Sequence, residues 1–167
     1  MGGGDIVPRV EVETLAPGHR NCARVTGAAL DLGEMLAAIR HPGNGAIVSF
    51  VGVVRVHARG RKVLRLEYHA YEPMAARVIK DAVREAETRW NVRAAVAHRV
   101  GSLEIGEVSV AIVIGGEHRA EAFAACRHLI DRIKAEAPIW KKEHYENGEE
   151  WIEGGPGSDY NQTPGIL

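Results

Sequence analysis

An apolar run at positions 46–54 constrains the fold of this chain most. It is interrupted only by Ser49 and Gly52 and is rich in β-branched residues. A run of this length is far too short to cross a bilayer, and its composition is typical of a strand buried on both faces. The run therefore predicts a central strand in a sheet that must be covered by other elements.

The spacing of apolar residues predicts two long helices to cover that sheet. The first begins near Pro73, which the first helical turn tolerates, and runs for about five turns to Trp90. The second runs from about Arg119 to Ala137. Its inward face is predicted from spacing: Ala122, Phe123, Cys126, Leu129, Ile130 and Ile133. Asp31 is a predicted N-cap for a shorter helix that ends near Arg40.

The remaining segments predict strands and turns. Alternation indicates strands at 6–14, 23–26 and 63–71, the last pairing with the strand before it. Strands at 92–100 and 108–114 flank a turn at 101–106, and Asn147-Gly148 predicts a hairpin between 139–145 and 150–152. We therefore expect one α+β domain over residues 1–153, with two long helices on a mixed sheet. Residues 154–167, rich in Gly, Pro and Asn, are expected to be a flexible tail.

Composition excludes several classes of protein. The 167 residues carry a formal net charge of −1, so no global field recruits nucleic acid or membranes, and an anion site must be local. The two cysteines, Cys22 and Cys126, do not form a disulfide scaffold or a structural zinc site and suit a reducing compartment. The first residues lack the pattern of a signal peptide. We expect a cytoplasmic protein without a metal or other cofactor, in which Cys126 is an inert core thiol and His98 is packed in a strand.

The segment 134–143 concentrates positive charge around a proline that ends a predicted helix. Lys134 lies in the last turn of the predicted helix, and Pro138 prevents the helix from continuing. Lys141 and Lys142 follow in a predicted strand, where their side chains point to opposite faces. Alternation predicts that Ile139, Lys141 and Glu143 share one face and that Trp140 and Lys142 share the other. Such a cluster suits an anionic substrate, or a carbonyl that needs a nucleophile or proton donor. The alternative is an edge strand that lysines protect from aggregation.

Lys134 lies at the margin of the buried helix face, in a stripe with Phe123, Arg127 and Ile130. Desolvation there would lower the pKa of an amine and suit it to acid, base or nucleophilic chemistry. The alternative is a side chain whose stem packs while its amine stays in water.

Two further sites can hold an anion. The step 115–119 places His118 and Arg119 where a strand meets a helix start, although it also fits an ordinary turn. Arg55 ends the apolar run and opens a basic loop.

Taken together, these motifs resemble the large, catalytic subunit of molybdopterin synthase. The resemblance covers residues 30–153 and rests on blocks in the same order and with compatible spacing. They are Gly45 to Arg55, Leu66-Glu67-Tyr68, Tyr71, Met74-Ala75, His98 to Gly101, Gly106-Glu107, His118 to Phe123, Lys134 to Glu143, and Trp151.

The resemblance implies an α/β hammerhead fold with an additional antiparallel β subdomain. It implies an enzyme that builds the dithiolene of molybdopterin from precursor Z, a cyclic pyranopterin monophosphate. Sulfur would arrive as a thiocarboxylate on the C-terminal Gly-Gly of a small ubiquitin-like subunit whose tail enters the large subunit. Large subunits would form a homodimer, with one small subunit at each end to give a heterotetramer.

The resemblance also implies roles for individual residues. Lys134 matches the catalytic lysine and Lys141 a supporting one. Arg55, His118, Arg119 and Lys142 would bind the anionic substrate. Phe50, Met74, Trp140 and Glu143 would form the pocket for the partner's tail.

The chain departs from the family in two places. Gly154 to Gly157 stand where a basic residue is common, and His69 stands where an acid is common.

Other functions remain open from the sequence. A module that only binds a Gly-Gly tail would not need Lys134 together with His118 and Arg119. A sensor of small anions or nucleotides would leave 140–142 unexplained. RNA binding is disfavoured because an aromatic content of 5% offers few stacking surfaces.

Overall fold

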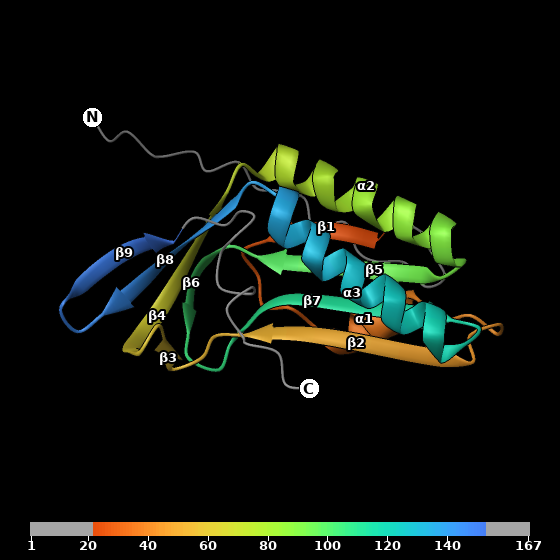
Figure 1. Cartoon of the computed structure of the whole chain (residues 1–167), viewed down its shortest axis with the longest axis horizontal. Coiled ribbons are helices and arrows are strands. Elements are labelled where there is room, and N and C mark those ends of the chain that lie inside the picture. Colours follow the sequence, from red (N-terminus) through yellow and green to blue (C-terminus); the bar gives the residue numbers. More distant parts are fainter. Residues whose placement is uncertain (1–21, 153–167) are drawn as a thin grey trace, which may run out of the picture.

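The computed structural model describes residues 22–152, which form two sheets and three helices (Figure 1). The predicted strand at 6–14 and the predicted tail at 154–167 lie outside these residues. The strands are β1 Cys22–Thr26, β2 Ala46–Val53, β3 His57–Ala58, β4 Arg61–Ala70, β5 Arg93–Arg99, β6 Gly101–Glu104, β7 Val108–Gly116, β8 Ile139–Tyr145 and β9 Gly148–Ile152. The helices are α1 Leu32–Ala38, α2 Glu72–Trp90 and α3 Arg119–Glu136.

The first sheet is mixed and has the strand order β1-β5-β7-β2. β1 runs parallel to β5, and the other pairs are antiparallel. The long helices α2 and α3 lie over one face, and α1 packs on the other through Met35 and Ile39, both fully buried (Figure 1). The predicted α+β fold with two long helices on a mixed sheet is confirmed.

The predicted central position of the 46–54 strand is wrong, because β2 is an edge strand of the first sheet. Its Ile47 and Val53 are about half exposed, whereas β5 and β7 fill the centre with almost fully buried runs. An almost continuous apolar run identifies a strand that needs covering on both faces. It does not tell whether this chain or another surface supplies the cover.

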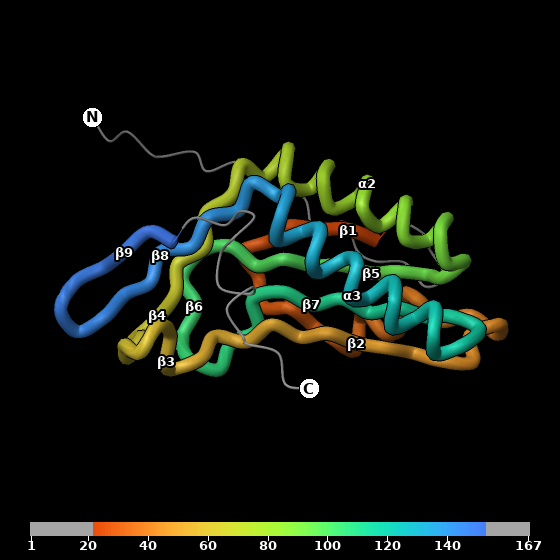
Figure 2. The backbone as a smooth tube through the Cα atoms, viewed as in Figure 1, coloured from red at the N-terminus to blue at the C-terminus, as the bar shows by residue number. Residues whose placement is uncertain are grey.

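A second, antiparallel sheet joins β3, β4, β8 and β9, with β6 also paired to β4. Figure 2 shows the backbone leaving β2 and turning into this sheet at one end of the molecule. The predicted pairing of 63–71 with the preceding long strand is therefore wrong, since β4 pairs with β8 instead. The predicted turn at 101–106 holds β6, framed by Gly101 and Gly106 at φ values of 93° and 88° that favour glycine. The predicted hairpin of β8 and β9 is confirmed.

Local signals account for the helix boundaries. Asp31 caps α1 by accepting hydrogen bonds from the backbone N–H groups of Gly33 and Glu34, as predicted. Asn91 ends α2 in the left-handed conformation, at φ 49°. No helix within residues 22–152 is long and apolar enough to cross a membrane.

The predicted inward face of α3 needs one correction. Phe123, predicted to point inward from α3, is 62% exposed. Met74 is exposed at the start of α2, where Ala75 and Ile79 are the buried residues.

Candidate active site

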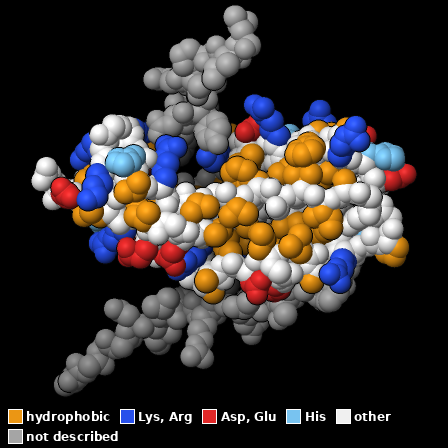
Figure 3. Space-filling view, turned by 90° about the horizontal axis from the view of Figure 1, so that it is seen from below, with side chains coloured by type: hydrophobic (Ala, Val, Ile, Leu, Met, Phe, Trp, Pro, Cys, Tyr) orange, Lys and Arg blue, Asp and Glu red, His pale blue; other side chains and the backbone are white. Residues whose placement is uncertain are grey.

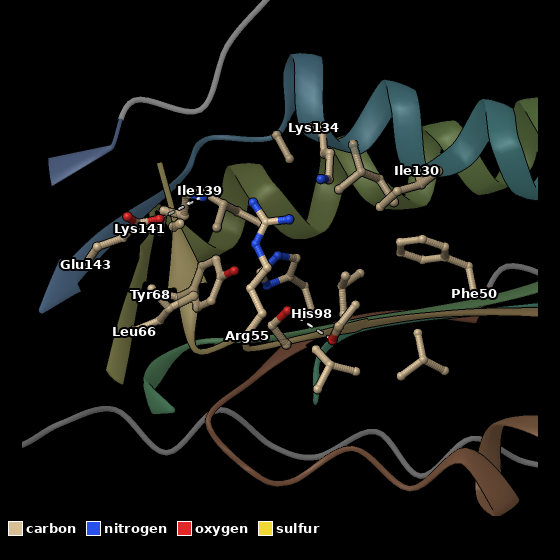
Figure 4. A pocket seen from close by; sticks show the side chains of 18 of the residues that line it. Phe50, Arg55, Leu66, Tyr68, His98, Ile130, Lys134, Ile139, Lys141 and Glu143 are labelled. Carbon is tan, nitrogen blue, oxygen red and sulfur yellow. Dashed lines mark hydrogen bonds and ion pairs between the residues drawn. The ribbon is translucent and has the colours of Figure 1, made fainter. Parts of the chain in front are cut away.

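A cavity of about 640 Å³ opens where the two sheets and the end of α3 meet (Figure 4). Its walls are the end of β2, the last turns of α3, and the side of β4 and β8 that faces them. The residues that line the cavity include Phe50, Gly52, Arg55, Tyr68, His98, Ser109, Ile130, Lys134, Lys141 and Glu143.

The cavity combines an apolar side with a cationic side. Phe50, Ile130 and Ile133 line the apolar side together with other aliphatic residues. Arg55, Lys134, Lys141 and Glu143 contribute three positive charges and one negative charge, a formal net charge of +2. In a chain whose net charge is −1, this cavity provides the local positive field that an anionic ligand requires.

A buried carboxylate holds Lys141 at the cavity. The Nζ of Lys141 lies 3.2 Å from Oε1 of Glu143, whose exposed fraction is 2%. The hydroxyl of Tyr145 donates to the other oxygen, Oε2, at 2.5 Å. Burial and the neighbouring Glu143 raise the pKa of Tyr145 to about 12, so the phenol keeps its proton. The Arg61 guanidinium lies 3.5 Å from the centroid of the Tyr145 ring, and this cation–π contact helps to hold the ring beside Glu143.

Arg55 and Lys134 reach the same cavity from opposite walls (Figure 4). Arg55 is exposed and forms no ion pair with any carboxylate of residues 22–152, so its charge is available to a ligand. Lys134 lies in the last turn of α3, where a cation is favourable. Its side chain is exposed, so burial within this chain does not supply the desolvation that we expected from the helix margin.

His98 brings a neutral ring to the same cavity. It lies at the end of β5 with an exposed fraction of 7%, and its Nδ1 is 2.9 Å from the carbonyl oxygen of Arg99. The Tyr68 ring packs edge-on against it, with centroids 5.2 Å apart. Burial, with a smaller effect of the positive charge of Lys134, lowers the pKa of His98 to about 4, although the hydrogen bond to Arg99 opposes this shift.

Several predicted site residues lie outside this cavity. His118 and Arg119 are at the start of α3, about 22 Å along the helix axis from Lys134 at 1.5 Å per residue. Lys142 is on the opposite face of β8, 2.7 Å from Glu149 and over the Trp151 ring. Trp140 shares that face and is 42% exposed. The predicted alternation of Lys141 and Lys142 is confirmed.

Comparison with known proteins assigns the family. The sequence model described as MoaE protein matches residues 25–136, which is more than half of the chain. The chain belongs to the MoaE family. The molybdopterin synthase catalytic subunit of Nostoc sp. is 42% identical over 150 residues, covering 88% of this chain and 91% of the relative.

Solved structures of related proteins share the fold of this MoaE protein. The molybdopterin synthase from Staphylococcus aureus has a TM-score of 0.77 and 32% identity, covering 81% of this chain and 99% of that one. A second structure is the complex of subunits 1 and 2 of molybdopterin-converting factor from Helicobacter pylori. It has a TM-score of 0.65 and 27% identity, covering 78% of this chain and 89% of that one.

Neither cysteine of this MoaE protein belongs to the cavity. Cys126 is a buried residue of α3, as predicted, and burial raises its pKa to about 11. Cys22 is buried in β1, and burial raises its pKa as well. Within residues 22–152, no group of three or more His, Cys, Asp or Glu side chains is placed to hold a metal ion.

Sequence reasoning missed three polar residues at or behind the cavity: Tyr68, His98 and Tyr145. His98 was expected to be only packed, and it is indeed buried, but it also lines the cavity. The placement of Tyr145 two residues after Glu143, on the same face of β8, was a readable signal for their contact.

Proposed function

We propose that this chain is the catalytic subunit of a molybdopterin synthase. It transfers sulfur from the C-terminal thiocarboxylate of a small ubiquitin-like subunit to precursor Z and so forms the molybdopterin dithiolene. The observation that carries the proposal is the single cavity that gathers Arg55, Lys134 and Lys141 in a chain of this family. We place the reaction in the cytoplasm, since the cysteines of this chain are free thiols that suit a reducing compartment.

The thiol inventory supports an external sulfur donor. The chain has two cysteines, and both are buried with raised pKa values. A thiolate is the nucleophilic form of cysteine, so neither residue is suited to carry the transferred sulfur. A thiocarboxylate on a partner's tail provides the sulfur that this chain lacks.

The two sides of the cavity suit the two reactants. The cationic side, with Arg55 and Lys141, complements the phosphate of precursor Z. The apolar side, with Phe50 and Ile130, suits an extended Gly-Gly tail, which has no side chains to accommodate. Glu143 lines the cavity but is engaged by Lys141, so we assign it the holding of that lysine. Met74 and Trp140 are exposed outside the cavity, and we propose that they contact the body of the small subunit.

Lys134 is the proposed acid/base group. It lies on the rim, opposite Arg55, where its amine can exchange protons with attacking sulfur and departing oxygen groups. Water leaves the cavity when both reactants occupy it, and the desolvation that is absent in the free chain would then be present. Lys141 stabilises developing negative charge.

A homodimer would bring His118 and Arg119 of one copy to the cavity of the other. Within residues 22–152, β2 pairs with β7 along one edge and with no strand along the other. Figure 3 shows hydrophobic side chains gathered on the face of the molecule seen from below. Ile47, Val53 and Phe123 are each about half exposed or more, the kind of apolar edge that is normally covered.

The direction of β2 determines which residues such a dimer brings together. His118 and Arg119 follow Gly116, which pairs with the first residue of β2, whereas the cavity lies at its last residues. Antiparallel pairing of two β2 edges across a two-fold axis places the start of one strand beside the end of the other. We propose that each cavity receives His118 and Arg119 from the second copy.

The catalytic assignment is tested by Lys134→Ala. Reconstituted with thiocarboxylated small subunit and precursor Z, this variant should form molybdopterin at least about a hundredfold more slowly, the usual range for an acid/base group. Arg127→Ala, an exposed substitution on the same helix, is the matched control and should retain full activity. Normal turnover by folded Lys134→Ala would favour a module that only binds the Gly-Gly tail.

The shared cavity is tested by mixing two inactive variants. In a mixed dimer of Lys134→Ala and Arg119→Ala, one cavity carries both substitutions and the other carries neither. Random exchange makes half of the dimers mixed, so about a quarter of wild-type activity should return. Failure of the mixture to recover any activity, with exchange verified by mass spectrometry, would place Arg119 outside the partner's cavity.

A further inference from the structure

The ring of His98 has one nitrogen in use and one without a partner. Nδ1 lies 2.9 Å from the carbonyl oxygen of Arg99, and a carbonyl oxygen only accepts hydrogen bonds. Nδ1 therefore carries the proton. The neutral ring then has a bare lone pair on Nε2, which no side chain or backbone group of residues 22–152 contacts through a hydrogen bond.

Burial makes this lone pair significant. His98 is 93% buried, counted from its exposed fraction of 7%, and it lines the cationic cavity (Figure 4). Nε2 is not one of the sealed, unpartnered side-chain atoms of residues 22–152, so in the empty cavity this atom faces water. A ligand N–H that reaches it replaces that water with a hydrogen bond. The position of the ring in the cavity wall allows a ligand to do so.

The other polar groups of the cavity have different functions. Arg55, Lys134 and Lys141 are donors. Both oxygens of Glu143 are engaged, by Lys141 and by Tyr145. The Ser109 hydroxyl donates to the carbonyl of Gly52 and also interacts with Tyr68. His98 Nε2 is thus an acceptor with no donating ability, whereas the hydroxyls of Tyr68 and Ser109 both donate and accept.

We propose that His98 Nε2 accepts a hydrogen bond from an N–H group of the molecule that occupies the cavity. This inference rests on the proposed function for the identity of that molecule. Two ligands of that reaction carry such a donor: the pterin ring, through its ring N–H and exocyclic amine, and the glycine tail, through its peptide N–H groups.

The protonation behaviour of His98 separates this role from that of a base. With a pKa of about 4, only about one ring in a thousand is protonated at pH 7, so the ring is a poor proton carrier. A protonated, positively charged ring at this position would also repel the ammonium group of Lys134. The ring therefore selects a neutral donor, whereas the three cations bind charge.

The test uses a matched pair of amide substitutions in the full chain. In His98→Asn, the amide N–H can replace the Nδ1 donor to Arg99, but no acceptor reaches the position of Nε2. In His98→Gln, the longer side chain places an amide oxygen near Nε2. Affinities are measured by calorimetry for neopterin monophosphate, for a synthetic peptide ending in Gly-Gly, and for inorganic phosphate.

We expect His98→Asn to weaken binding of one N–H ligand about tenfold, the value of one hydrogen bond, and to leave phosphate binding unchanged. The ligand that weakens identifies the source of the N–H. His98→Gln should bind both ligands within about twofold of the wild type. Unchanged binding of both N–H ligands by His98→Asn, or an equal loss of phosphate binding, would overturn the proposal. A wild-type chain that binds neither ligand would also overturn it and, unlike those outcomes, would count against the proposed function.

A second measurement needs no substitution. Long-range ¹H–¹⁵N correlation spectra of the wild-type chain at pH 7 should show the Nδ1–H tautomer for His98. The Nε2 resonance should shift when the N–H ligand saturates the site, and it should not shift with inorganic phosphate. An Nε2–H tautomer, or an Nε2 resonance unmoved by saturating ligand, would contradict the assignment.

Discussion

The burial of His98 makes the stability of this protein depend on pH in a defined window. In the unfolded chain the ring takes up a proton as the pH falls through 6.5, whereas in the folded chain it stays neutral down to about 4. Between these values the unfolded state binds more protons, so the free energy of unfolding falls as the pH falls. Above pH 6.5 the ring is neutral in both states and the full free energy of unfolding is retained. Below about pH 4 the loss that the buried ring causes is complete.

The size of the effect follows from the pKa difference. A shift from 6.5 to about 4 spans about 2.5 pH units, and each unit is worth about 1.4 kcal/mol, which gives a loss of roughly 3 kcal/mol. Such a loss is a large fraction of the 5–15 kcal/mol that ordinary domains have. The carboxylates Glu67, Glu107 and Glu149, whose hydrogen bonds lower their pKa, protonate below 4.5 and so act in a lower window.

The assay is urea unfolding followed by tryptophan fluorescence at pH 7 and pH 4.5, for wild type and His98→Gln. The glutamine does not titrate, so its unfolding free energy should fall less between the two pH values, by about 2–3 kcal/mol. All other groups are shared and cancel in the comparison. If both proteins lose the same free energy, the ring of His98 is not held neutral and the reasoning is refuted.

Two other substitutions test the walls of the cavity. Tyr145→Phe removes the donor to Glu143 Oε2 and should cost about 1–3 kcal/mol, measured as a lower urea midpoint, because a buried acceptor is left unsatisfied; an unchanged midpoint would show that water replaces the hydroxyl. Gly52→Ala would place a Cβ 2.6 Å from Cγ1 of Val110, a buried β-branched side chain, and should destabilise the chain by about 1–3 kcal/mol. Equal thermal midpoints for Gly52→Ala and wild type would contradict the close approach of β2 and β7 at this row.

The elements that the sequence predicted well are those with local signals. Asp31, Pro73 and the apolar periodicity located the helices, and Asn147-Gly148 located the last hairpin. These signals depend on the backbone near each residue, so they can be read without knowledge of the rest of the fold.

The errors concern long-range pairing, which no local signal fixes. The apolar run of β2 occupies an edge and not the centre, and β4 pairs with β8, which begins 69 positions after Ala70. Of the cavity residues, Lys134, Lys141 and Glu143 were predicted in the segment 134–143, and Phe50 and Arg55 in the apolar run and at its end. His98 and Tyr68 come from separate strands, and only the joining of the two sheets brings them beside Lys134.

The central claim is that this chain catalyses sulfur transfer from a partner's thiocarboxylate to precursor Z. The most direct measurement mixes the purified chain with precursor Z and thiocarboxylated small subunit, and scores molybdopterin by the fluorescence of its oxidised derivative. We predict product in proportion to the thiocarboxylate supplied, and none when the small subunit ends in an ordinary carboxylate. A folded chain that binds the small subunit but yields no product with the thiocarboxylate would contradict the account.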